Sequence, residues 1–240
     1  MRELGRALMD VLLPEGGCAI CGGSLPSGDP PPFGPSSLAW EPEVCPRCLD
    51  EVFTQRPRPS PLSAEVAVHL DGVVTAGSYA GALQSAVLRL KAAPDLRLAR
   101  FLGRLLAESL QAPGLPAGWG GIVPVPLHRS RLLERGFNQA ALLAAELGGA
   151  LGSPVLSDLC ERVRATPLQS GCTREERARN VANCFRLRRV GLLGTRPLTF
   201  VIVDDVVTTG ATAGELARVL KAGGAEVVWC AAVARAGSMM

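Results

Sequence analysis

The chain has 240 residues, of which 48% are hydrophobic and 20% charged, a composition that excludes a disordered chain. No stretch approaches the roughly 18 uninterrupted apolar residues of a membrane helix, and no secretory signal is apparent, so we expect a cytoplasmic protein. In that compartment the eight cysteines are not expected to form a disulfide framework.

The N-terminal part is expected to be a small module over residues 1–58. Residues 2–13 have the apolar spacing of a short amphipathic helix. Two Cys-x-x-Cys pairs follow it. Residues 56–61 read Arg-Pro-Arg-Pro-Ser-Pro, which forms neither a regular helix nor a central strand. We interpret this segment as the linker to a second domain over residues 59–240.

After the linker, strand-like and helix-like patterns alternate, which indicates an α/β domain with a parallel sheet. The net charge of +3 is placed unevenly, because residues 121–200 hold twelve Arg, no Lys and six acidic residues. Such a segment favours a polyanionic partner, and a solvated Arg-rich surface is the alternative. In chain order the pattern predicts one or two strands over 66–76, helices over 81–92 and 95–110, and a strand over 121–125. It then predicts helices over 137–147 and 173–182, a strand over 199–203, a helix over 213–222 and a strand over 226–233.

The two cysteine pairs are Cys18 with Cys21 and Cys45 with Cys48. Two thiolates at this spacing can share one tetrahedral ion, and two such pairs make a closed, structural four-thiolate site. A bound Zn²⁺ would supply on the order of 10 kcal/mol to a segment that has little apolar material of its own. The alternatives are four unrelated thiols or a redox dithiol.

The predicted strand over 199–203 is followed by two carboxylates, Asp204 and Asp205, and then by a loop of small and hydroxyl residues. Ligands of open α/β sheets bind at the carboxyl ends of strands. The loop amides and the start of the next helix suit a phosphate, whereas the carboxylates suit sugar hydroxyls or Mg²⁺. This arrangement predicts a site for ribose 5-phosphate, with an ordinary turn as the alternative.

The loop resembles the signature for 5-phosphoribosyl-1-pyrophosphate (PRPP) in type I phosphoribosyltransferases. Four further motifs look like the ComF family, whose members are associated with natural competence. They are Val123 to Leu127, Arg135 to Gln139, Arg162-x-Arg164-x-Thr166-Pro167-x-Gln169, and Arg177-x-x-Asn180-Val181-x-x-x-Phe185.

The resemblance implies a type I phosphoribosyltransferase-like parallel sheet flanked by helices, with a small zinc-ribbon-like module before it. It implies that Mg²⁺ binds together with PRPP. The implied PRPP-binding residues are Asp204, Asp205, Val207, Thr208, Thr209, Gly210, Ala211 and Thr212. The implied pyrophosphate ligands are Arg129 and Arg131, and the implied catalytic residues are Arg135, Arg162 and Arg164.

Two positions have a second interpretation. Lys91 fits the family's pattern, but Ala92 stands where the family tends to have an aromatic residue. Arg177 lies within a family motif, yet it and Arg179 can also be read as solvating a helix face.

The implied reaction transfers a phosphoribosyl group from PRPP to a nitrogen nucleophile. One alternative is a non-catalytic sensor of PRPP or a related nucleotide. Another is an accessory factor whose zinc module and Arg-rich segment contact single-stranded DNA or a protein of the DNA-uptake machinery. An aromatic content of only 4% disfavours single-strand binding, which usually relies on base stacking.

Overall fold

The structure is a computed structural model that describes residues 17–25, 43–54, 69–111, 119–166, 173–188 and 199–237. The predicted helix over residues 2–13 and the predicted linker at 56–61 lie outside these ranges. The boundary between residues 58 and 59 lies outside them as well, so the division into two domains stays a prediction. Within the described ranges, no helix is both long enough and apolar enough to cross a membrane.

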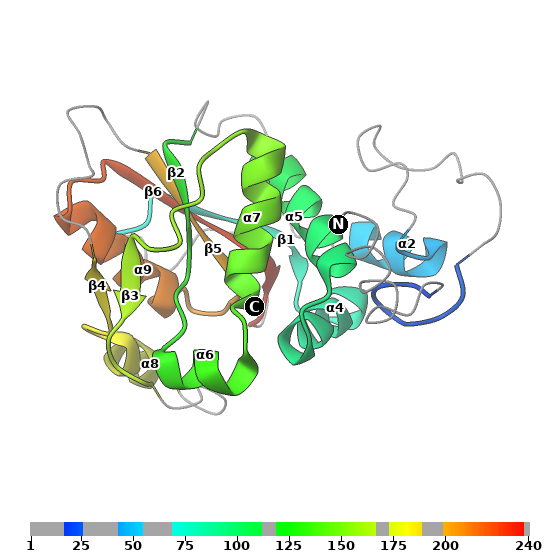
Figure 1. Ribbon diagram of the computed structural model, residues 1–240, viewed down its shortest axis with the longest axis horizontal. Coiled ribbons are helices and arrows are strands. Elements are labelled where there is room, and N and C mark those ends of the chain that lie inside the picture. Colours follow the sequence, from blue (N-terminus) through cyan, green and yellow to red (C-terminus); the bar gives the residue numbers. More distant parts are fainter. Residues whose placement is uncertain are drawn as a thin grey trace, which may run out of the picture.

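A four-stranded parallel sheet forms the centre of the molecule (Figure 1). Its strands are β1 (Gly72–Ser78), β6 (Val227–Arg235), β5 (Thr199–Val207) and β2 (Gly121–Pro124), in that spatial order. Every neighbouring pair is parallel. The two central strands are almost entirely apolar, as expected of strands that are covered on both faces. The predicted parallel α/β sheet is therefore confirmed.

Helices cover both faces of this sheet. On one face, α5 (Leu96–Leu110) and α7 (Gln139–Leu151) pack together with Val201 and Val203 of β5. On the other face, α9 (Ala211–Ala222) packs with Phe200 and Ile202. Successive residues of a strand point to opposite faces, so Asp205 continues the first series and Asp204 the second.

The strand β5 is longer than predicted. The sequence predicted a strand that ends at Val203, but β5 continues to pair with β6 through Asp204 and Val207. The pairing is possible because Val206 and Val207 extend the β-branched run on the far side of the two carboxylates. Both aspartates therefore lie within the C-terminal half of β5, and the hydrogen bonds of the sheet fix their backbone.

Four short elements were not predicted. They are α2 (Pro46–Thr54), α6 (Arg129–Arg135), β3 (Cys160–Arg162) and β4 (Phe185–Leu187). The strands β3 and β4 form a separate antiparallel pair. The predicted helix over 173–182 is α8 (Arg174–Val181), which begins in a capping box that Thr173 and Glu176 form.

The cysteine-containing segments pack against the sheet domain through α2 and α4 (Gly81–Ala92) (Figure 1). Their buried residues belong to the same hydrophobic cluster as α4 and α5. The amide of Ala82, at the start of α4, donates to Glu51 Oε1 at 3.1 Å, although the N-cap residue Ala80 offers α4 no side-chain cap. A second contact joins Arg100 Nη1 to Glu43 Oε1 at 3.0 Å.

Candidate functional site

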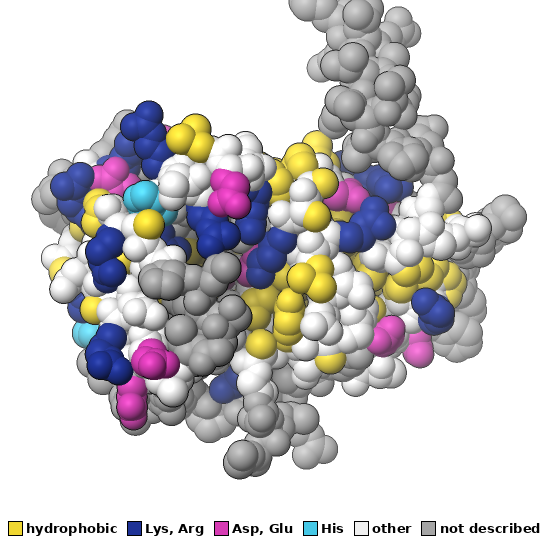
Figure 2. Space-filling model, turned by 90° about the horizontal axis from the view of Figure 1, so that it is seen from below, with side chains coloured by type: hydrophobic (Ala, Val, Ile, Leu, Met, Phe, Trp, Pro, Cys, Tyr) yellow, Lys and Arg dark blue, Asp and Glu magenta, His cyan; other side chains and the backbone are white. Residues whose placement is uncertain are grey.

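A cavity of about 300 Å³ lies at the carboxyl ends of the central strands. Both aspartates line it, together with the loop that connects β5 to α9. The end of β5 and the first turn of α9 line it as well, and four more residues come from elsewhere: Tyr79 after β1, Lys91 at the end of α4, Arg177 on α8 and Ala236 after β6. The position agrees with the general preference of ligands for this edge of an open α/β sheet. Seen from below, the surface carries separate groups of Lys and Arg side chains with acidic groups between them (Figure 2).

The carboxylate of Asp205 is buried, with 5% of the residue exposed, and two side chains hold it. Lys91 Nζ lies 3.3 Å from its Oδ1 atom, and Gln139 Nε2 donates to its Oδ2 atom at 2.9 Å. Arg135 in turn donates to Gln139 Oε1 at 2.6 Å. The buried charge is thus balanced by a cation and fixed by a hydrogen-bond chain, as a buried carboxylate requires.

The carboxylate of Asp204 is half-buried and keeps access to the cavity. Burial, and then the charge of Asp205, raise the pKa of Asp204 to about 7. Lys91 and Arg162 oppose this shift, and the amide of Asp205 donates to Asp204 Oδ1 at 2.9 Å. A cation or a hydroxyl donor bound in the cavity would stabilise the charged form of this carboxylate and so lower its pKa.

The loop after β5 has the geometry of an anion cradle. Gly210 adopts a left-handed conformation, with φ of 78°, and precedes the first turn of α9. The first amides of a helix have no partner within the helix, and they carry the positive end of its dipole. Thr208, Gly210, Ala211 and Thr212 line the cavity, whereas the Thr209 hydroxyl accepts a hydrogen bond from the Ala211 amide at 3.4 Å.

The arginines that the resemblance assigned to catalysis do not line the cavity. Arg135 acts on Asp205 through Gln139, as described above. Arg162 packs over the ring of Phe185, with 5.4 Å to its centroid, and donates to Thr166 Oγ1. Arg164 Nη2 donates to the carbonyls of Asn180, at 3.0 Å, and Ala182, at 2.8 Å, and thereby caps the C-terminal end of α8.

The two arginines that the resemblance assigned to pyrophosphate lie on α6, beyond the cavity lining. Arg129 is exposed and Arg131 is half-buried. The helix begins after His128, whose ring nitrogen Nδ1 accepts from the Ser130 amide at 3.3 Å. His128 also pairs with Arg162 of β3, so this loop and the short antiparallel sheet lie side by side.

The sequence of this chain is similar to those of other proteins over most of its length. DNA utilization protein YhgH of Salmonella typhi is 37% identical over 219 residues, which cover 89% of this chain and 82% of the relative. The chain belongs to the ComF family. Competence protein F of Haemophilus influenzae is 34% identical over 181 residues, which cover 69% of this chain and 73% of that protein. No family model matches the chain.

The parallel sheet and its flanking helices resemble those of solved phosphoribosyltransferases. Adenine phosphoribosyltransferase from Leishmania tarentolae has a TM-score of 0.38 and 16% identity over 62% of this chain and 74% of its own. Glutamine PRPP amidotransferase from B. subtilis has a TM-score of 0.37 and 17% identity over 60% of this chain and 26% of its own.

Sequence reasoning missed several side chains that line or support the cavity in this ComF protein. Tyr79 and Arg177 line it, and Gln139 holds Asp205. Lys91 was noted only as a residue that fits the family pattern. Gln139 and Arg177 both lie within the sequence motifs that resemble the ComF family, and this position in a motif was the signal that could have indicated a role.

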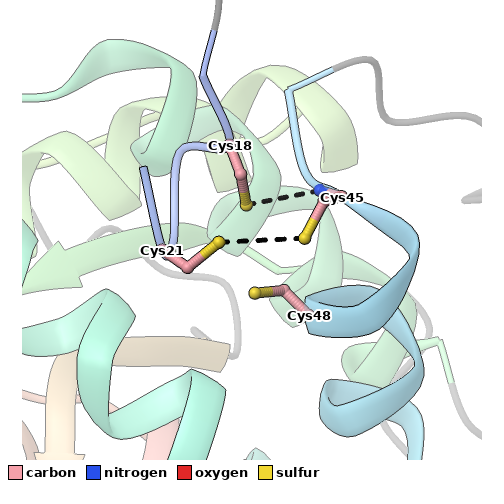
Figure 3. A group of neighbouring side chains, drawn as sticks. All are labelled: Cys18, Cys21, Cys45 and Cys48. Atoms are coloured by element: carbon pink, nitrogen blue, oxygen red, sulfur yellow. Dashed lines mark hydrogen bonds between the residues drawn. The ribbon is translucent and has the colours of Figure 1, made fainter. Parts of the chain in front are cut away.

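A second cluster lies in the cysteine-containing segments. The Sγ atoms of Cys18, Cys21, Cys45 and Cys48 all lie within 4.8 Å of one another and point toward a common centre (Figure 3). The Sγ atoms of Cys21 and Cys45 are 3.8 Å apart. Four sulfurs around a tetrahedral Zn²⁺ lie about 3.8 Å apart, given Zn–S bonds of about 2.3 Å. The cluster is therefore compatible with a small zinc module.

The thiol chemistry of the cluster fits a cation as well. Burial acts to raise the pKa of the Cys18 thiol, but hydrogen bonds from the amides of neighbouring residues outweigh it and lower that pKa to about 7. One of these is the Cys45 amide, which donates to Cys18 Sγ at 3.3 Å. Burial and the neighbouring sulfurs raise the pKa of Cys48 instead. Cys18 ionises readily, whereas the raised pKa values of Cys45 and Cys48 oppose their ionisation, a conflict that a divalent cation removes.

Proposed function

We propose that this protein binds PRPP in the cavity at the carboxyl edge of its sheet and transfers the phosphoribosyl group to a nitrogen nucleophile. The observation that carries the proposal is the joint placement of Asp204, Asp205 and the loop over 207–212 around one cavity of about 300 Å³. The loop suits the 5-phosphate, and the carboxylates suit the ribose hydroxyls. The names of the relatives, DNA utilization protein and competence protein, support a role for this activity in the use of external DNA.

In the proposed reaction, the bond between C1 of the ribose and the pyrophosphate oxygen breaks, and the acceptor nitrogen bonds to C1 and loses its proton. The ribosyl carbon becomes cationic in between. The carboxylate of Asp204 lies where it would hold a hydroxyl of that ring, and its charge favours the cationic ring electrostatically. Asp205 is already fixed by Lys91 and Gln139, so it needs no reorganisation when the ligand arrives.

Mg²⁺ is expected to enter with the pyrophosphate of PRPP. Carboxylate oxygens and phosphate oxygens are the ligands that this ion prefers, so Asp204 is the residue of this chain best placed to meet it. When bound, the ion would neutralise charge on the departing pyrophosphate. Arg135 would support the site through its hydrogen bond to Gln139, and the charge of Arg162 would stabilise the charged form of Asp204.

We further propose that Cys18, Cys21, Cys45 and Cys48 bind a structural Zn²⁺ ion. The convergence of their sulfurs supports this assignment. All of the described cysteines are free thiols, which fits a reducing, cytoplasmic setting. The zinc module would be the part that meets single-stranded DNA or a protein of the uptake machinery, because α2 lies on the side of α4 away from β5 (Figure 1).

The proposal is tested by incubating the full chain with Mg²⁺, radiolabelled PRPP and a panel of nucleobases and amines. Release of pyrophosphate that depends on one acceptor is the expected result. PRPP binding in calorimetry without turnover across the panel would favour the sensor function instead. If PRPP produces no binding heat at all in the presence of Mg²⁺, the proposed site is wrong.

A further inference from the structure

Among the residues that the structure describes, two cationic side chains line the cavity, and different contacts hold them. Lys91 Nζ is already engaged with Asp205, at 3.3 Å. Arg177 is half-buried, and its Nε atom is buried without a hydrogen-bond partner among the described residues. A buried guanidinium donor left unpaired costs free energy, so its retention at a cavity wall points to a partner that arrives from outside.

The helix that carries Arg177 is fixed at both ends. The capping box of Thr173 and Glu176 holds the start of α8, and Arg164 binds the carbonyls of its last turn. Just beyond the helix, the amide of Asn183 donates to Glu215 Oε1 of α9 at 2.8 Å. α8 is therefore anchored on α9, and it presents Arg177 to the cavity from a defined position.

The neighbours of Arg177 in the cavity wall indicate which group of a ligand it would meet. Ala211 and Thr212, in the first turn of α9, line the same cavity, and α8 packs against α9. The helix amides and a guanidinium both donate to anionic oxygens, and the planar guanidinium matches two oxygens of a phosphate. A cation is also needed here, because the two aspartates of the cavity oppose the approach of an anion.

We propose that Arg177, on α8 beside the first turn of α9, binds the terminal 5-phosphate of the ligand together with the loop over 208–212. This inference rests on the proposed function and deepens it: the cavity selects phosphorylated pentoses through one side chain of α8. In this arrangement Lys91 pairs with the carboxylate of Asp205, and Arg177 pairs with the phosphate of the ligand. The nearby Arg179 is exposed on the same helix and does not line the cavity, so it provides a matched control.

Calorimetric titrations of PRPP, ribose 5-phosphate and inorganic pyrophosphate into the full chain separate the groups that Arg177 could contact. Loss of a charge-assisted contact corresponds to about 10- to 100-fold weaker binding. In Arg177→Gln we expect this loss for PRPP and for ribose 5-phosphate, with pyrophosphate unchanged. Arg177→Lys should recover part of the affinity, and Arg179→Gln should bind all three ligands as the parent protein does.

Three outcomes overturn the inference. Equal affinities for the parent protein and Arg177→Gln would show that the side chain makes no contact with the ligand. A loss for PRPP and pyrophosphate with ribose 5-phosphate unchanged would place Arg177 on the leaving group. A lower melting temperature in Arg177→Gln, with ligand affinities regained at lower temperature, would show a structural role. If the parent protein binds neither PRPP nor ribose 5-phosphate, the proposed function itself fails.

Discussion

The cysteine cluster and the cavity of this protein are built in opposite ways. The cluster joins two short segments, 17–25 and 43–54, through four sulfur atoms that lie within 4.8 Å of one another. The cavity lies at the edge of a sheet whose central strands are buried on both faces. The sheet and the helices packed on it hold the two carboxylates in place without a ligand, whereas the thiols lie together at a cost that a cation would remove. We therefore expect the first site to need its ligand in order to fold and the second to fold without one.

Removal of the metal should therefore have the largest effect, and it should stay local. Structural zinc contributes on the order of 10 kcal/mol to such modules. We expect a strong chelator to abolish hydrogen-exchange protection over 17–25 and 43–54 and at the start of α4, where Glu51 binds the Ala82 amide. Protection of β5, β6 and α9 should persist. Mass spectrometry of exchanged peptides from the full chain measures both.

Single substitutions check the same prediction without a chelator. Cys48→Ser should lower the zinc content of the purified protein, measured by atomic emission, well below one ion per chain. Cys160→Ala removes a buried thiol outside the cluster and should leave one ion per chain. If chelation leaves the protection of both segments unchanged, the cysteine module does not need a metal and the contrast between the two regions disappears.

Substitution of the cavity carboxylates should have the opposite character, with binding lost and the fold kept. We expect Asp204→Asn to weaken PRPP binding in calorimetry by about 100-fold, the equivalent of one or two charge-assisted hydrogen bonds. Asp205→Asn should weaken it similarly and lower the free energy of unfolding by about 2 kcal/mol, because Lys91 loses its charged partner. Asp158, whose side chain is 81% exposed, is the matched control as Asp158→Asn.

Full PRPP affinity in both variants would contradict the proposed site. Loss of the far-ultraviolet circular dichroism signal in Asp204→Asn would contradict the idea that the sheet holds this edge without a ligand.

The raised pKa of Asp204 predicts a smaller effect, on the pH dependence of stability. The folded protein keeps this proton up to about pH 7, whereas the unfolded chain releases it near its ordinary value of 3.8. The folded state therefore binds more protons between these values, and the stability from this group falls as pH rises through that window, by at most about 1.4 kcal/mol per pH unit. Urea unfolding at pH 5 and pH 7.5 measures the change.

Asp204→Asn isolates the contribution of that group, because all other titrating groups remain. We expect the loss of stability between pH 5 and pH 7.5 to be smaller in this variant than in the parent protein. Parallel pH profiles for the two proteins would show that Asp204 titrates in the folded state much as it does in the unfolded chain.

The extent to which the sequence predicted the fold follows from the size of each element. The buried strands and the long helices left clear periodic patterns, and Asp95 and Asn138 cap α5 and α7 with their side chains. In contrast, β3 and β4 have three residues each, too few for a pattern. The helix α6 has no buried residue, so it carries no apolar period. The helix α2 was hidden because Cys45 directly precedes it and Cys48 lies in its first turn, so the segment indicated part of a metal site.

The candidate site divides in the same way. The loop over 207–212 and the two aspartates are contiguous, so their residue types alone indicated a phosphorylated sugar. Arg177 and Lys91 reach the cavity from α8 and α4, far away in sequence, and only the packing of those helices brings them together. Arg164 shows the converse: its motif indicated catalysis, whereas its side chain caps α8.

The smallest predicted effect concerns the bond that joins the two regions. Glu51 caps α4 from the cysteine module, and the last turn of α4 carries Lys91 beside Asp205, so one helix connects the two sites. Loss of a helix cap costs about 1 kcal/mol, and we expect Glu51→Ala to lower the free energy of unfolding by that amount. Glu51→Gln keeps an acceptor oxygen and should retain most of the stability. PRPP affinity should change by less than about threefold in either variant, because the sheet holds Asp205 independently of the cap. Urea unfolding and calorimetry measure the two quantities.

A tenfold loss of affinity in Glu51→Ala with normal binding in Glu51→Gln would mean that the cysteine module controls the cavity through α4, and the two regions would then be one functional unit.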